Sequence, residues 1–144
     1  MDVDMVLVPI DGSERAMEAV EYAAAIADRY DAALHVLYML GAEAAAALDS
    51  GTIEATAVAE RGEQVMAAVR ALVGDTPLDH SSACGFSVSR LSQHPGSVIL
   101  DVAESLDADF VVIPRQPAAG APDAVIEKAA EYVLAYASQP VLSV

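Results

Sequence analysis

The 144-residue sequence has a single cysteine, Cys84, so no disulfide can form within the chain. Disulfides persist in oxidising compartments, and we therefore expect a protein of the reducing cytoplasm. The opening residues lack the basic start and small-residue cleavage site of a signal peptide, which favours the same location. No apolar run reaches the roughly 18 residues that a bilayer requires. The sequence therefore predicts no membrane span.

Positive charge is also scarce. Seven basic residues, of which Lys128 is the one lysine, oppose 22 acidic residues and leave a net charge of −15. A chain of this charge repels nucleic acid and anionic membranes, so we expect neither as a partner. An acidic, lysine-poor surface is typical of adaptation to high salt, where screening shortens the reach of charge repulsion. We therefore expect a halophilic source.

The sequence also lacks the spacings of common catalytic and metal sites. His35, His80 and His94 show no H-x3-H pattern and have no C-x2-C beside them, so we expect no metal. Cys84 is most simply a buried side chain, because only residue type supports a Cys–His pair. No G-x-S-x-G elbow and no G-x4-G-K-[ST] loop is present. We expect no catalytic residues and no enzyme activity.

What the sequence does have is a regular alternation of strand-like and helix-like segments. Hydrophobic residues make up 55% of it, enough for one domain over residues 1–144. We predict strands at Met5–Ile10, Ala32–Leu40, Leu78–Phe86, Asp109–Ile113 and Pro140–Val144, and helices at Glu14–Tyr30, Thr52–Gly74, Pro95–Asp107 and Pro122–Ala137. Gly41–Gly51 is predicted as loop or loose helix. This alternation indicates a doubly wound parallel sheet, with a ligand crevice at the carboxyl ends of the strands.

Local signals place the ends of these helices. Ser13 suits an N-cap, Gly74 a C-cap and Pro95 a first helical turn. Gly62 destabilises its helix by about 1 kcal/mol relative to alanine, so any break in this helix is expected at Gly62. The residues predicted to share the buried face of the first helix are Met17, Val20, Ala24, Ala27 and Tyr30.

Three segments together resemble the universal stress protein family. They are "VLVPIDGSERAMEAVEYAAAIA", "ILDVAESLDADFVVI" and "AAEYVLAYASQPVLSV". The resemblance implies a flavodoxin-like or Rossmann-like fold with five parallel strands in the order 3-2-1-4-5. It also implies a homodimer that pairs through the last strand. The residues of that strand are Val141, Leu142, Ser143 and Val144.

Many members of this family bind ATP through G-x2-G-x9-G-[ST] after the fourth strand. Here the four motif positions are occupied by Pro114, Pro117, Glu127 and Lys128. The spacing is kept but every motif residue is replaced, while Gly120 matches a further glycine that is common in the family's loop. The sequence thus resembles a branch that lacks the ATP-binding motif.

Each replacement has a physical consequence. Pro114 and Pro117 have no N–H to donate to a phosphate, and their φ is fixed. Glu127 places a carboxylate beside the phosphates, and two unit charges ~4 Å apart repel by about 4 kcal/mol at an effective dielectric of ~20. This exceeds the ~0.3–1 kcal/mol attraction of a helix end for an anion. Arg115 and Lys128 act in the other direction, because either can neutralise Glu127 or reach a phosphate.

The sequence leaves two functions open. The first is a non-enzymatic homodimer of the stress response, which binds another protein and does not hold ATP in the usual mode. The alternative is a nucleotide- or small-molecule-binding module that uses the weak candidates Asp11, Arg115, Gly120 and Lys128. Asp11 matches an acidic position near the adenosine of ATP-binding relatives, and it also suits a simple turn. An adenylate hydrolase is the weakest hypothesis, because no activated nucleophile is visible.

Overall fold

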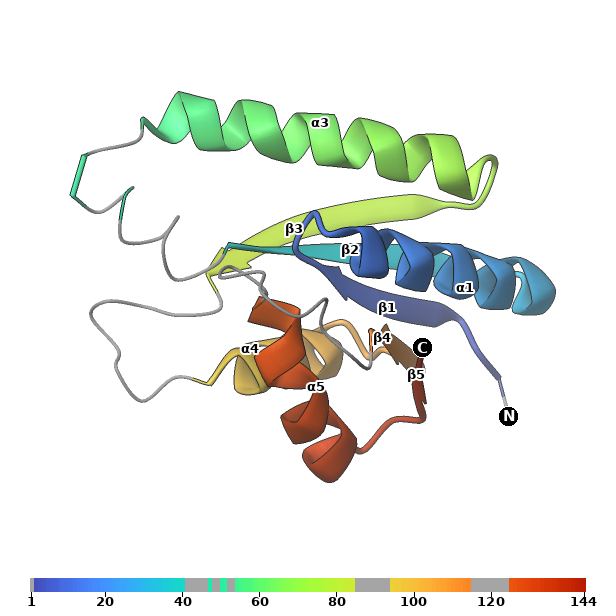
Figure 1. Ribbon diagram of the computed structural model, residues 1–144. Helices are drawn as coiled ribbons and strands as arrows, with labels where there is room; N and C mark the ends of the chain where they lie inside the picture. The colour runs from blue at the N-terminus through green and yellow to red at the C-terminus, as the bar shows by residue number, and fades with distance from the viewer. Residues whose placement is uncertain (1, 41–46, 48–49, 52–53, 85–93, 115–124) are drawn as a thin grey trace.

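The computed structural model describes residues 2–40, 47, 50–51, 54–84, 94–114 and 125–144 (Figure 1). The side chains of residues 83–84 and 125–128 lie outside this description, as do most of Gly41–Gly51 and the start of the last predicted helix. None of the helices in the described ranges is long and apolar enough to cross a membrane.

The described residues form a five-stranded parallel sheet with helices in the connections. In chain order the elements are β1 (Met5–Ile10), α1 (Glu14–Tyr30), β2 (Ala33–Leu40), α3 (Ala55–Val73), β3 (Leu78–Cys84), α4 (Pro95–Ser105), β4 (Phe110–Ile113), α5 (Val125–Tyr136) and β5 (Val141–Ser143). The strand order is β3-β2-β1-β4-β5, and every neighbouring pair is parallel. This confirms the predicted fold class and strand order.

The helices cover both faces of the sheet, with α1 and α3 on one face and α4 and α5 on the other (Figure 1). The central strand β1 shows why, because its side chains alternate between two apolar clusters. Val6 and Val8 pack on the α1 and α3 side, whereas Leu7 packs on the α4 and α5 side, and all three are fully buried. A strand buried on both faces reads as a continuous apolar run, as "MVLVPI" does.

Both ends of α1 follow the prediction, but the burial of its last residue does not. Ser13 caps the helix, and its Oγ accepts a hydrogen bond from the Ala16 N–H at 3.2 Å. The chain leaves α1 at Asp31, which takes a left-handed conformation (φ 55°). Tyr30 was predicted on the buried face, and this is wrong: the side chain is 49% exposed. Tyr30 is the last residue of the helix, three residues beyond Ala27, the last buried one.

The second long helix, α3, runs without a break through Gly62, and Gly74 ends it at φ 62°, as a C-cap glycine allows. Its buried residues, Met66, Val69 and Val73, all lie in its carboxyl-terminal half. A Cβ added at Gly62 would have no atom within 4 Å. Packing inside the chain therefore does not require glycine at this position.

The pair α4 and α5 packs much more closely. Pro95 lies in the first turn of α4, as predicted, and the His94 Nδ1 accepts a hydrogen bond from the Gly96 N–H at 3.0 Å. The His94 ring also stacks on Tyr132 of α5, with 4.6 Å between ring centroids. A Cβ added at Gly96 would lie 2.6 Å from the Tyr132 Cβ, so here the glycine is sterically required.

The same substitution is expected to have opposite effects at these two glycines. Gly62→Ala should raise the free energy of unfolding by about 1 kcal/mol, because alanine favours the helix and meets open space. For a chain of this size that corresponds to a rise of about 2–4 °C in Tm. Gly96→Ala should lower it by about 1–3 kcal/mol, since the added methyl group overpacks against Tyr132. Urea and thermal unfolding of both variants would test this, and a destabilised Gly62→Ala would contradict the open space around Gly62.

Candidate functional site

The predicted crevice lies where the strand order reverses, between β1 and β4. β1 pairs with β2 along all of Met5–Ile10, but its ladder to β4 consists of the Val6–Phe110 and Leu7–Val111 pairs. The chain leaves β1 towards α1 on one face of the sheet and approaches α5 on the other face after β4. The loops after Ile10 and Ile113 therefore leave the same edge of the sheet at its switch point, where open α/β sheets bind ligands.

On the β1 side, the crevice begins with a tight turn. The Asp11 carboxylate is half-buried, and its Oδ1 accepts a hydrogen bond from the Ser13 N–H at 3.0 Å. Gly12 has a φ of 83°, which favours glycine, and a Cβ placed there would lie 3.6 Å from a methyl group of Val65. The predicted turn-forming role of Asp11 is thus confirmed, and its second oxygen has no hydrogen bond among those described.

On the β4 side, the described chain reaches only the first motif position. Pro114 directly follows β4 and is buried. Arg115, Pro117 and Gly120 lie outside the described residues. Glu127 and Lys128 belong to the first turn of α5, but their side chains lie outside the description. The fold therefore brings Asp11 and Pro114, the residues that directly follow β1 and β4, to one edge of the sheet, as the sequence predicted.

Each of the three histidines has a different hydrogen-bond partner. The His35 Nε2 lies 2.8 Å from the Ser81 Oγ between β2 and β3, the His80 Nε2 lies 3.4 Å from Arg70, and His94 caps α4. Cys84 is the last residue of β3, and its side chain lies outside the description. Among the residues that the structure describes, no group of three or more His, Cys, Asp or Glu side chains is placed to hold a metal ion.

Two cavities occur away from this crevice. One, of about 290 Å³, lies between α3 and the β2–β3 part of the sheet, and the other, of about 470 Å³, lies where α1 and α3 end. Neither Asp11 nor Pro114 lines either of them. The sequence reasoning missed the first cavity, although Ala55, Ala59 and Gly62 at helical spacing were a visible sign of a thin helix face.

Together, the sheet order and the switch-point crevice define a doubly wound α/β protein of the Rossmann-like class. The model of the universal stress protein family matches residues 3–144, so the chain belongs to that family. A comparison with curated proteins finds no match.

Solved structures of the same family share the fold. The universal stress protein UspA from Lactobacillus plantarum has 22% identity and a TM-score of 0.70, covering 100% of this chain and 99% of that one. A universal stress protein in complex with cAMP has 17% identity and a TM-score of 0.69, with 100% and 98% covered. One from Archaeoglobus fulgidus in complex with dAMP has 18% identity and a TM-score of 0.63, with 98% and 96% covered.

The buried His35 generates a prediction on pH. Burial lowers the pKa of His35 from its usual 6.5, Asp79 opposes this and His80 adds to it. The folded chain thus binds this proton less readily than the unfolded chain, so the contribution of His35 to stability is present above pH 6.5 and is lost as the pH falls below it. His35→Gln keeps a polar group near Ser81 but does not titrate.

The free energy of unfolding of the wild type should therefore fall, relative to that of His35→Gln, as the pH is lowered through 6.5. Urea titrations of both proteins at a series of pH values would measure the difference. The two proteins share all other titratable groups, so a constant difference across the range would contradict a lowered pKa of His35.

Proposed function

We propose that residues 1–144 form a single universal stress protein domain that acts without catalysis, as a cytoplasmic homodimer, and that does not hold ATP through the family's glycine motif. Family membership supports the domain and the non-enzymatic role. The observation that carries the nucleotide part is Pro114, which is buried at the first motif position. Binding of a partner protein remains a prediction. We expect neither nucleic acid nor a membrane as a partner.

A phosphate loop needs backbone N–H groups directed at the ligand, and glycine lets the chain approach closely. Pro114 supplies no N–H, and Pro117 removes a second donor in the next part of the loop. In the first turn of α5, Glu127 already supplies the negative charge that a helix start favours. The two missing N–H donors and the added carboxylate support a loop that binds a triphosphate poorly.

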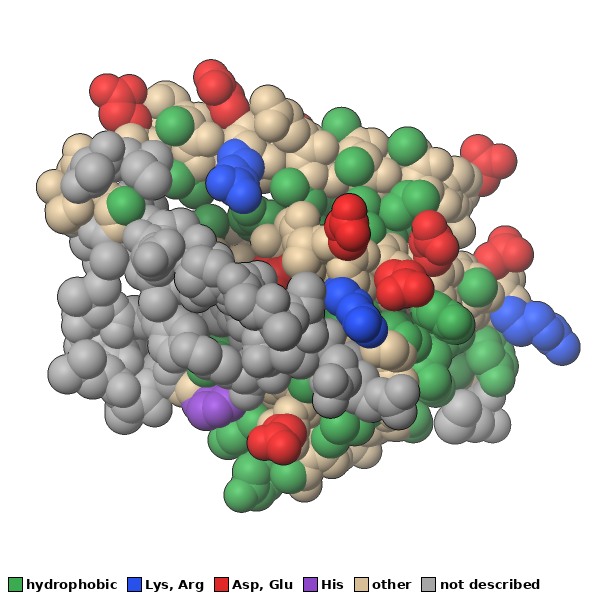
Figure 2. All heavy atoms as spheres, viewed as in Figure 1, with side chains coloured by type: hydrophobic (Ala, Val, Ile, Leu, Met, Phe, Trp, Pro, Cys, Tyr) green, Lys and Arg blue, Asp and Glu red, His purple; other side chains and the backbone are tan. Residues whose placement is uncertain are grey.

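The edge strand β5 supports the homodimer. It pairs with β4 on one side only, and its residues are half-buried. The Ser143 Oγ is buried without a hydrogen-bond partner in the part of the chain that the structure describes. Hydrophobic side chains gather on the surface around this strand, below a band of acidic ones (Figure 2). An unprotected apolar edge favours pairing with another chain.

The apolar surface continues onto the helices that flank β5. Ile26 of α1 packs in the same cluster as Leu142 and Val144, and Leu134 and Tyr136 of α5 are 48% and 68% exposed. β5 is only three residues long, so a few strand hydrogen bonds alone would not hold two copies together. The proposed dimer therefore depends on these apolar side chains as much as on the strand.

A second function, a nucleotide- or small-molecule-binding module, is favoured by the structures of the relatives with cAMP and dAMP. Those ligands carry a single phosphate, which needs fewer backbone donors than a triphosphate. In this chain the module would use Asp11, Arg115, Gly120 and Lys128 at the switch-point crevice.

Nucleotide binding separates the two proposals. Calorimetry with ATP and with AMP, at high salt and with or without Mg²⁺, should detect no binding tighter than about 1 mM, which corresponds to about −4.1 kcal/mol. Submillimolar binding of AMP would favour the module instead. Binding of ATP with that affinity would overturn the proposal for the motif.

A quadruple variant provides the matched test of the loop. Pro114→Gly, Pro117→Gly, Glu127→Gly and Lys128→Ser together restore the motif, and they should create ATP affinity if the loop is a closed form of the family's site. Circular dichroism would verify that the variant is folded. A folded variant with no gain in affinity would show that these four positions do not correspond to the motif.

The oligomeric state tests the edge strand. Val144→Asp places a side-chain carboxylate directly after β5 in both copies, at a half-buried apolar position, so the two negative charges and the loss of apolar burial should convert a dimer into a monomer. Leu72→Asp is the matched control, because Leu72 is 41% exposed on α3, away from β5. Light scattering at high salt would measure both. A folded Val144→Asp protein that stays dimeric would rule out β5 as the interface.

A further inference from the structure

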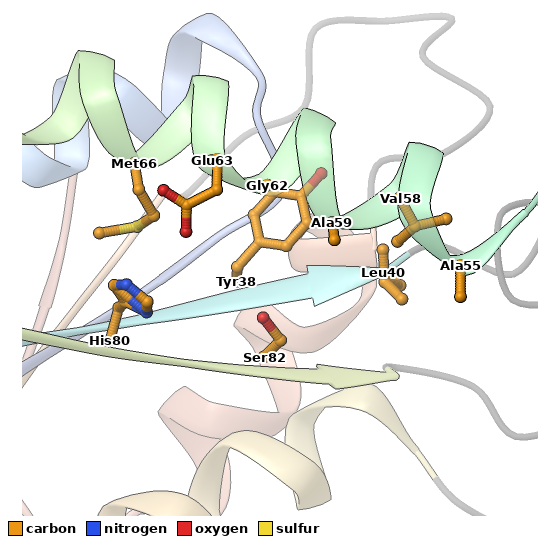
Figure 3. A pocket seen from close by; sticks show the side chains of 10 residues that line it. All are labelled: Tyr38, Leu40, Ala55, Val58, Ala59, Gly62, Glu63, Met66, His80 and Ser82. Carbon is orange, nitrogen blue, oxygen red and sulfur yellow. The ribbon is translucent and has the colours of Figure 1, made fainter.

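The cavity of about 290 Å³ lies beneath the amino-terminal half of α3, against the carboxyl-terminal parts of β2 and β3 (Figure 3). Its volume is close to the lower limit of about 300 Å³ for small-molecule sites. The described residues that line it are Tyr38, Leu40, Ala55, Val58, Ala59, Gly62, Glu63, Met66, His80 and Ser82. It is distinct from the switch-point crevice and from the β5 surface.

The cavity exists because α3 changes character along its length. In its carboxyl-terminal half Met66, Val69 and Val73 are buried against the sheet, whereas the same face of the amino-terminal half presents Ala55, Ala59 and Gly62. Gly62 stands out among these small residues. Glycine weakens a helix interior, and here no neighbouring atom lies where a side chain would begin. No contact within the described chain explains a glycine at this position. A ligand in the cavity would explain it, because the ligand would occupy the space next to the helix.

Polar groups lie at one side of an otherwise apolar space. Figure 3 shows the Glu63 side chain extending from α3 towards the sheet, and His80 and Ser82 rising from β3. The His80 Nε2 lies 3.4 Å from the Arg70 guanidinium. Because a guanidinium can only donate, this contact makes Nε2 the acceptor and leaves N–H on Nδ1. The Tyr38 ring, Leu40 and Val58 supply apolar surface.

The charge of the lining selects the kind of ligand. Among the described residues that line the cavity, Glu63 is the only Asp, Glu, Lys or Arg. Its ion pair with Arg70 is long, at 3.9 Å, and solvent-exposed. Such a pair contributes little, so Glu63 remains able to bind another cation. The net charge of −15 further favours cationic over anionic ligands.

We propose that this cavity binds a small hydrophobic amine. Its apolar body packs against Tyr38, Leu40 and Val58, under Ala59 and Gly62, and its ammonium group pairs with the Glu63 carboxylate. Ser82 and His80 supply hydrogen-bonding groups on the facing strand. A nucleotide fits this lining poorly, because its phosphate would meet Glu63.

Three probes test the ligand class: 2-phenylethylamine, 3-phenylpropanoate as the anionic counterpart of similar size, and AMP. In NMR titrations of the full chain at millimolar concentrations, the amine should shift the amide signals of α3 and β3 and should bind at least about tenfold more tightly than the carboxylate. No shift with the amine, or equal affinity for the carboxylate, would overturn the proposal. AMP binding at these residues in preference to the amine would also overturn it.

Two variants locate the site. Ala59→Leu fills the cavity and should weaken amine binding at least about tenfold, while Ala71→Leu, on an exposed position of the same helix, should not change it. The unmodified chain should also bind the amine more tightly than 2-phenylethanol, a neutral probe of similar size, and Glu63→Gln should remove this preference. Both lining residues are exposed, so the fold should persist, and amide signal dispersion checks this. Unchanged amine binding in Ala59→Leu would place the amine elsewhere. The outcome of these amine titrations does not depend on whether the chain dimerises or binds ATP.

Discussion

Burial of β1 between two layers of helices is the constraint from which the other features of the fold follow. Val6, Leu7 and Val8 are fully buried, so both faces of the central strand must be covered. Parallel neighbours require right-handed crossovers, which place α1 and α3 on one face and α4 and α5 on the other. That reversal produces the switch-point crevice at the carboxyl ends of β1 and β4. It also leaves β3 and β5 as the two edges of the sheet.

Much of this arrangement was predictable from the sequence, because it depends on local signals. Apolar runs of strand length, the Ser13 cap, the Gly74 C-cap and Pro95 each act within a few residues of their own position. Tyr30 was the error, since helical periodicity gives a direction but not the extent of the sheet beneath it. The Asp11 turn could be predicted from "DGSE". The small residues at helical spacing up to Gly62 indicated a thin helix face, but the cavity beneath it could not be predicted from them. That space depends on Tyr38 and Ser82, which lie far from Gly62 in the sequence.

On the described side of the crevice, the chain uses two of its own backbone amides in hydrogen bonds. The Asp11 Oδ1 accepts from the Ser13 N–H, and the Ser13 Oγ accepts from the Ala16 N–H. One amide of the turn and one of the first helical turn are therefore already engaged. In the proposed closed loop, proline on the other side of the crevice removes donors in a different way, by having no N–H at all. A small ligand with one phosphate would have to compete for the engaged amides of Ser13 and Ala16. It would find no N–H at the proline positions on the other side.

The cavity beneath α3 follows from how a straight helix meets a sheet. Met66 is buried under the middle of α3, and its long side chain sets the distance between the helix and the sheet. A straight helix keeps that distance along its length, so the small side chains of Ala55 and Ala59 cannot reach β2 and β3. In α1 the buried face is mostly alanine, which lets the whole helix lie close to the sheet. Alanine therefore gives close packing in α1 and a cavity beneath α3, because α3, unlike α1, combines small residues at one end with large ones at the other.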